Sequence, residues 1–254
     1  DNFYIISLEA TTHDTLSVEE LIRWTMRTGD MSVAVMKKLD EANNEVYEHP
    51  SPHKVDVKIK KGPFIIVSGH DLRDLEQLLE QTEGKGINIY THGEMLPSHG
   101  YPGLKKYPHL IGNYGGAWQD QQKEFDGIPG CILMTTNCLM RPRETYKDRI
   151  FTTNVVGWDG VINIPKGKDG KKDFTPIIEK ALELGGFEED QEPHEITVGF
   201  GHHATLSNAE TIVDAVKEGK IRHFFLIGGC DGARPGRNYY TEFVKQTPKD
   251  SIIL

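Results

Sequence analysis

Cysteine, long apolar runs and excess positive charge are all scarce in this chain. Three cysteines in 254 residues are too few for a disulfide framework. No apolar run approaches the roughly 20 residues that a membrane-spanning helix needs. Lys and Arg number 29 against 38 Asp and Glu, which gives a formal charge of −9. No basic stretch is available to neutralise nucleic-acid phosphates. We therefore expect no nucleic-acid or membrane partner.

A signal-peptide pattern is also missing, and thiols without disulfide partners are typical of a reducing compartment. These features predict a soluble globular protein of the cytosol. The chain opens on Asp1 without an initiator methionine and closes on the apolar run Ser251–Leu254, as if within a strand. We expect these 254 residues to be part of a longer protein.

The first sixty residues have helical patterning. Ser17 and Glu20 form a capping box that predicts a helix ending at Gly29, and a second helix is expected over about 31–43. The polar, proline-bearing stretch 47–61 has no helical period and is typical of a linker. Residues 1–60 are therefore predicted to be the C-terminal part of a helical domain plus a linker.

From Pro63 onward, short apolar runs alternate with capped amphipathic helices, a pattern typical of βαβ units around a mainly parallel sheet. The predicted fold class is α/β, with a Rossmann-like domain over 61–190 and a second, incomplete α/β domain over 191–254. Helices are predicted after Asp71, from Thr175 to Gly185, and from a capping box at Ser207 to Gly219. The expected strands are 64–68, 87–91, 131–135, 196–200 and 223–227, with 251–254 a candidate sixth.

Four residues with metal-binding side chains follow expected strands. His70, Glu94, Cys138 and Cys230 each come shortly after a different apolar run, and the carboxyl ends of parallel strands meet at one edge of a sheet. A mixture of imidazole, carboxylate and thiolate differs from the four thiolates of a structural zinc or plain iron–sulfur site. The mixture favours iron with an open, reactive position.

Each of these residues also has a simpler interpretation. A histidine such as His70 is more often a loop or cap residue than a ligand, and Glu94 alone is typical of a solvated loop. Cys131 opens an apolar run, which predicts a small buried core residue. Cys138 and Cys230 lie instead in polar turns rich in Gly and Asn, which favours ligation over packing.

Two rival functions fit local motifs. Gly199–Ala204 follows an expected strand and matches the loose dinucleotide pattern G-x-G-x-x-A, which would make the chain a nucleotide-binding α/β module. His70, His92 and Glu94 could instead form the site of a zinc hydrolase. His92-Gly93-Glu94 matches the H-x-E of zinc deaminases, but their P-C-x-x-C partner motif is missing from the sequence.

The same residues lie in stretches that resemble the hybrid-cluster family, also called prismane proteins or hydroxylamine reductases, which are related to carbon monoxide dehydrogenase. The resemblance covers nearly the whole chain and corresponds to the middle portion of those proteins. The stretches that carry it are Gly62–Arg73, Tyr90–Asp126, Met134–Leu139, Tyr146–Asp159 and His223–Val244.

The resemblance implies a hybrid 4Fe-2O-2S iron–sulfur cluster held by one His, two Glu and four Cys. By motif, His70 of SGHD, Glu94 of THGEM and Cys138 of TTNC are ligands, and Cys230 of GGCDG is the persulfide position. The family's other ligands fall beyond Leu254, and its N-terminal cysteine cluster has no counterpart here. We expect the chain alone to hold an incomplete cluster, or none, and to be inactive.

The activity that the resemblance implies is reduction of a small nitrogen-oxide substrate. That substrate is hydroxylamine, which becomes ammonia, or nitric oxide in defence against nitrosative stress, and a redox partner protein supplies the electrons. His92 and His99 are candidate proton donors, since imidazoles often serve as acids near neutral pH. Structural hydrogen bonds in a Gly-rich loop are an equal alternative for both.

Overall fold

In a computed structural model of the chain, the described residues are 2–136, 138–229, 231–232 and 236–254. They form two compact units that meet in the sequence between Glu48 and His49. This division falls upstream of the boundary expected at residue 60, because part of the expected linker is a strand. No helix in the described ranges combines the length and apolarity needed to cross a membrane.

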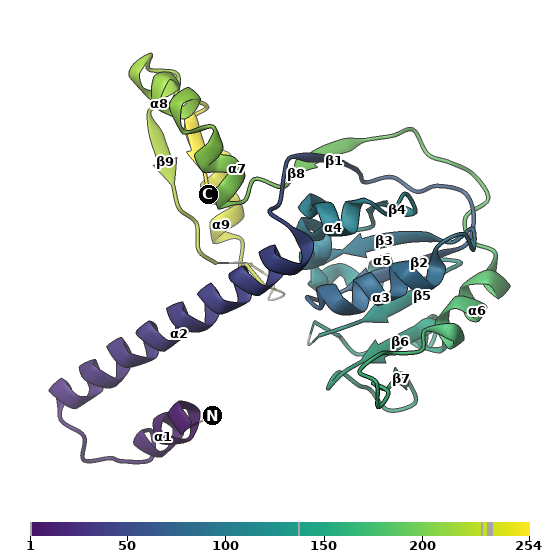
Figure 1. Ribbon diagram of the computed structural model, residues 1–254, viewed down its shortest axis with the longest axis horizontal. Helices are drawn as coiled ribbons and strands as arrows, with labels where there is room; N and C mark the ends of the chain where they lie inside the picture. Colours follow the sequence, from purple (N-terminus) through teal and green to yellow (C-terminus); the bar gives the residue numbers. More distant parts are fainter. Residues whose placement is uncertain (1, 137, 230, 233–235) are drawn as a thin grey trace. The chain divides into compact units, whose positions relative to one another are not determined.

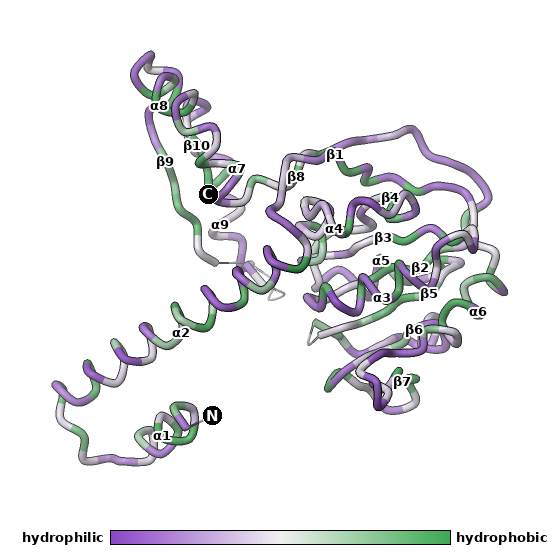
Figure 2. The backbone as a smooth tube through the Cα atoms, in the orientation of Figure 1, coloured by the Kyte–Doolittle hydropathy of each residue, from purple (hydrophilic) through white to green (hydrophobic). Residues whose placement is uncertain are grey.

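The first unit consists of two helices, α1 (Asn2–Ala10) and α2 (Val18–Tyr47). The capping box is confirmed, since Glu20 N–H donates to Ser17 Oγ and the Glu20 carboxylate accepts from Ser17 N–H. The helix end predicted at Gly29 is wrong, because the 30-residue helix α2 passes through Gly29 and ends at Tyr47. One glycine costs a helix only about 1 kcal/mol relative to alanine. Apolar and polar residues alternate along α2 (Figure 2).

The second unit is built on an eight-stranded sheet with the order β7-β6-β5-β2-β3-β4-β1-β8 (Figure 1). All neighbours are parallel except the antiparallel pair β1 and β8. This confirms the predicted α/β, Rossmann-like class. The strands are β1 (His53–Asp56), β2 (Phe64–Ser68), β3 (Asn88–His92), β4 (Leu110–Asn113), β5 (Cys131–Met134), β6 (Ile150–Thr153), β7 (Ile162–Ile164) and β8 (Glu195–Val198).

β8 extends this large sheet by pairing with β1, whereas the sequence placed it at the start of a new domain at residue 191. The two later strands, β9 (His223–Phe225) and β10 (Ser251–Ile253), pair in parallel as a separate two-stranded sheet. The sequence missed β1, β4, β6 and β7. These strands have three or four residues each.

Helix caps were predicted more successfully. α3 (Leu72–Thr82) begins after the Asp71 cap and α6 (Thr175–Leu184) ends at a left-handed Gly185, both as expected. The capping box at Ser207 is wrong, since its hydroxyl donates to the carbonyl of His203. The remaining helices are η1 (Gly93–Gly100), α4 (Pro102–Lys105), η2 (Trp118–Asp120), α5 (Gln121–Glu124), η3 (Lys147–Arg149), α7 (His202–Ser207), α8 (Ala209–Lys217) and α9 (Tyr239–Gln246).

β2 is the centre of the core. All five of its residues are buried, and α3 contributes three buried leucines to the same unit. Cys131 on the neighbouring β5 is fully buried, and burial raises the pKa of its thiol to about 12. The prediction that Cys131 is a small buried core residue is confirmed.

The chain changes direction across the sheet at β2. β3 and β4 follow on one side of it, and β5, β6 and β7 then run away on the other side. Parallel strands that diverge in this way leave a crevice outside their carboxyl ends, where open α/β sheets bind ligands. The loops after β2, β3 and β5 leave the sheet at this position.

A buried polar group lies close to the end of β3. The Thr91 hydroxyl donates to Asn113 Oδ1 and lies 2.9 Å from His99 Nε2. Burial, and secondarily the positive charge of His53, lowers the pKa of His99 from 6.5 to about 4. His99 is therefore a neutral imidazole at pH 7.

We predict that His99 makes stability fall with acidity. The unfolded chain protonates this imidazole below pH 6.5, whereas the folded chain does so only near pH 4, so the stabilisation is present above 6.5 and is lost between those values. The full effect is about 3 kcal/mol. The free energy of unfolding, measured with urea at pH 7 and at pH 5, should fall less in His99→Gln than in the wild type. The exposed His13→Gln should keep the wild-type loss, and an unchanged loss in His99→Gln would contradict the prediction.

The leucines of α3 should dominate the stability of the second unit. Leu78→Ala removes a side chain with no exposed surface, and such truncations cost about 2–5 kcal/mol. Leu182 on α6 is 45% exposed, and Leu182→Ala should change the free energy of unfolding by less than about 1 kcal/mol. Urea midpoints of the two variants test this, and equal shifts would refute it.

Candidate metal centre

The loop after β2 delivers His70. Gly69 has φ +115, and a Cβ there would lie 2.4 Å from Thr135 Oγ1 and 2.6 Å from Thr136 Oγ1. Only glycine allows this close approach between the β2 and β5 loops. His70 Nδ1 lies 2.7 Å from the Thr136 hydroxyl. The opposite ring nitrogen, Nε2, is therefore the one that could bind a metal ion.

The loop after β3 delivers Glu94. Gly93 has φ +59 and starts the short helix η1, whose first turn carries Glu94. Glu94 Oε2 lies 2.5 Å from His70 Nε2. The side chains of His70 and Glu94 are 46% and 60% exposed, so a small molecule can approach them.

Cys138 follows β5 and completes the group. Its thiol donates to Glu94 Oε2 over 3.8 Å. Burial, and then the negative charge of Glu94, raises the pKa of the Cys138 thiol. Gln121 holds the segment, since its Nε2 donates to the Cys138 carbonyl at 2.6 Å and its Oε1 accepts from Met140 N–H at 2.9 Å.

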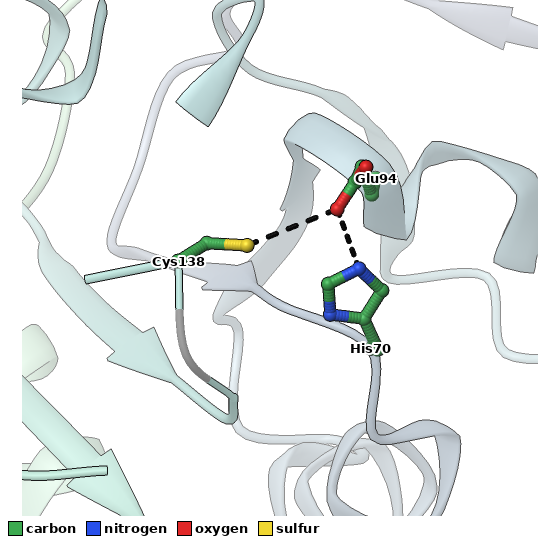
Figure 3. A group of neighbouring side chains, drawn as sticks. All are labelled: His70, Glu94 and Cys138. Carbon is green, nitrogen blue, oxygen red and sulfur yellow. Dashed lines mark hydrogen bonds and ion pairs between the residues drawn. The ribbon is translucent and has the colours of Figure 1, made fainter. Parts of the chain in front are cut away.

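Together, one imidazole nitrogen, one carboxylate oxygen and one sulfur lie within 4.8 Å of one another (Figure 3). His70, Glu94 and Cys138 form the one such group found among the residues that the structure describes. Three of the four predicted ligands are thus brought together. The fourth, Cys230, lies outside the described residues. This mixture of nitrogen, oxygen and sulfur donors suits an iron ion better than it suits a structural zinc ion.

The two candidate proton donors do not belong to this group. His92 is fully buried, with Nδ1 at 2.9 Å from Ser68 Oγ and Nε2 at 2.9 Å from Glu124 Oε2. Both of its ring nitrogens are engaged away from Glu94, so the zinc-hydrolase set of His70, His92 and Glu94 is not assembled. His99 is buried against Thr91, as described above. Their geometry supports the alternative of structural hydrogen bonds.

The dinucleotide interpretation of Gly199–Ala204 fails on topology. The strand before it, β8, is antiparallel to β1, and the next strand, β9, lies in a different sheet. A βαβ unit with a shared parallel sheet, which the motif requires, is therefore missing at this position. A Cβ on Gly199 would lie 2.1 Å from the Ser51 carbonyl oxygen, so chain packing explains this glycine.

Gln121 and Asn154 are the residues at this edge that the sequence did not suggest. Gln121 lies in a four-residue helix, and Asn154 follows the unrecognised strand β6. An isolated amide side chain has no spacing signal. The asparagine combines a side-chain amide with a left-handed backbone, φ +56.

The chain is similar to known proteins over nearly its whole length. The family model described as Prismane/CO dehydrogenase family matches residues 2–254. A protein named hydroxylamine reductase from Thermodesulfovibrio yellowstonii is 62% identical over 92% of this chain and 42% of its own length. Proteins with the same name from Syntrophobacter fumaroxidans and Moorella thermoacetica are 53% and 56% identical over 99% and 92% of this chain.

The matched share of those two relatives is 46% and 53%. The chain thus spans about half the length of the curated relatives it matches. The match to the family model nevertheless runs through all the elements described above, including the loops that carry His70, Glu94 and Cys138. This chain belongs to the Prismane/CO dehydrogenase family.

Proposed function

We propose that this chain supplies part of the iron–sulfur centre of a hydroxylamine reductase. The observation that carries the proposal is the convergence of His70, Glu94 and Cys138 within 4.8 Å at the point where the sheet changes direction. The shared name of relatives that are 53–62% identical supports the substrate class. We name hydroxylamine rather than nitric oxide because those relatives are named for it.

The donor set fits an iron–sulfur group. His70 Nε2, Glu94 Oε2 and the Cys138 thiolate would hold iron, with Cys230 as the expected persulfide position. When bound, the cluster supplies the electrons that reduce the N–O bond. In the net reaction, hydroxylamine takes up two electrons and two protons and gives ammonia and water. A redox partner protein, which we place with this protein in the cytosol, would supply the electrons.

The chain's own residues would shape the substrate side of the centre. His70 and Glu94 are partly exposed, so this edge admits a small polar molecule. His92 and His99 would act here through hydrogen bonds within the sheet. Protons would come from other groups or solvent, since His99 is neutral at pH 7.

The family resemblance implies that the hybrid 4Fe-2O-2S cluster needs more ligands than the four candidate residues of this chain. We therefore expect this chain by itself to bind an iron ion without assembling the complete cluster, and to be inactive as a reductase. The remaining ligands would come from other parts of a longer protein.

Iron binding by the chain tests this proposal. Anaerobic titration with Fe2+ should show about one ion per chain, and His70→Ala or Cys138→Ser should weaken binding at least 10-fold, the scale of losing an inner ligand or its support. Cys131→Ala is the matched control, because Cys131 is fully buried in the core, and it should bind iron as wild type does.

Hydroxylamine should also perturb the absorption spectrum of the iron-loaded wild type and leave that of His70→Ala unchanged. Iron binding that survives both ligand substitutions would refute the metal centre. Tight iron binding at a site insensitive to hydroxylamine would refute the substrate assignment.

A further inference from the structure

A hydrogen-bonded network lies beside the candidate metal centre and joins three strand ends. Asn154 follows β6, and its side-chain Nδ2 lies within hydrogen-bond distance of Asp71 Oδ2 and Asp74 Oδ2, both at 3.1 Å, of the Thr135 carbonyl at 3.2 Å and of Thr153 Oγ1 at 3.3 Å. Asp71 and Asp74 belong to the start of α3, and Thr135 follows β5. One amide group thus bridges the loops after β2 and β5.

One of the two carboxylates in this network, that of Asp74, has a lysine partner. Asp74 is 1% exposed and forms an ion pair with Lys172, whose side chain is 6% exposed. The backbone N–H of Lys172 donates to Gln77 Oε1 on α3 at 2.9 Å. A buried carboxylate without a partner costs several kcal/mol, so the contact with Lys172 holds Asp74 in place for Asn154.

Short covalent paths connect the network to the ligands. Asp71 is adjacent to His70, caps α3 by accepting from Asp74 N–H at 3.0 Å, and donates its own N–H to Thr135 Oγ1 at 3.3 Å. Thr136, next to Thr135, holds His70 Nδ1. A shift of either loop would therefore change the separation between His70 and the segment that leads to Cys138.

The backbone of Asn154 supports a specialised role. Its φ of +56 is uncommon outside glycine, and asparagine tolerates it better than most residues. Glycine would satisfy the backbone more easily, but it has no amide to donate. Residues held in such conformations cluster at functional sites.

We propose that Asn154, supported by the Asp74–Lys172 pair, is a positioning residue that sets the distance between the His70 loop and the Cys138 loop. The proposal rests on the proposed function for the identity of the ligands. Asn154 touches none of the three ligand side chains in the contacts above, so it acts through Asp71 and Thr135.

The test compares three variants of the whole chain. Asn154→Gly keeps the left-handed backbone and removes the amide, and Asn154→Asp places a third carboxylate beside Asp71 and Asp74. Asn88→Ala is the control, because Asn88 Nδ2 donates to the Lys61 carbonyl at 3.0 Å at the amino end of β3, the opposite edge of the sheet. Co2+ affinity, followed by the thiolate-to-metal absorption band, and amide hydrogen exchange are measured on each.

We expect Asn154→Gly to weaken Co2+ binding about 10- to 100-fold, the usual cost of losing a residue that orients a ligand. Asn154→Asp should weaken it at least as much, because of carboxylate repulsion. Amide exchange should accelerate in the peptides that contain His70 and Thr136 and stay unchanged elsewhere in the sheet. Asn88→Ala should keep wild-type Co2+ affinity and wild-type exchange in those two peptides.

Unchanged exchange in the His70 and Thr136 peptides of Asn154→Gly would overturn the proposal, as would faster exchange with undiminished Co2+ affinity. Failure of the wild type to bind Co2+ would count against the metal centre. In that case amide exchange alone tests the positioning role. Faster exchange in the His70 and Thr136 peptides of Asn154→Gly would support the role, and unchanged exchange would overturn it.

Discussion

The divergence of the chain on either side of β2 is the constraint on which the rest of the site depends. Because β3 and β5 are both parallel neighbours of β2, three loops leave the sheet side by side at its carboxyl edge. Each carries one donor, and these donors lie within 4.8 Å. Any other order of these three strands would place His70 at least one further strand spacing, roughly 5 Å, away from Glu94 or from Cys138.

Neutral groups make the direct hydrogen bonds to His70 and to the Cys138 carbonyl. The Thr136 hydroxyl orients His70, and the Gln121 amide holds the Cys138 carbonyl. Hydroxyls and amides add hydrogen bonds without adding net charge beside the donors. Among the three donors, Glu94 and the Cys138 thiolate would balance the charge of a bound cation.

The sequence predicted the grouping of His70, Glu94 and Cys138 better than it predicted their surroundings. Parallel strands end at one edge whatever their order, so reading the residues after apolar runs found His70 and Glu94 without knowledge of the topology. Gln121 and Asn154 were missed because they follow short elements with no periodic pattern. The Gly199 motif misled because a strand, a glycine turn and a helix are local features, whereas the antiparallel pairing of β8 with β1 is set by residues far away in the chain.

The most direct test of the central claim, that His70, Glu94 and Cys138 share one metal, is iron X-ray absorption spectroscopy on the anaerobic, Fe2+-loaded chain. The account predicts a first shell containing nitrogen or oxygen together with sulfur. It also predicts that imidazole scattering disappears in His70→Ala and that the sulfur contribution falls in Cys138→Ser. A shell of oxygen alone, or a spectrum unchanged in both variants, would contradict it.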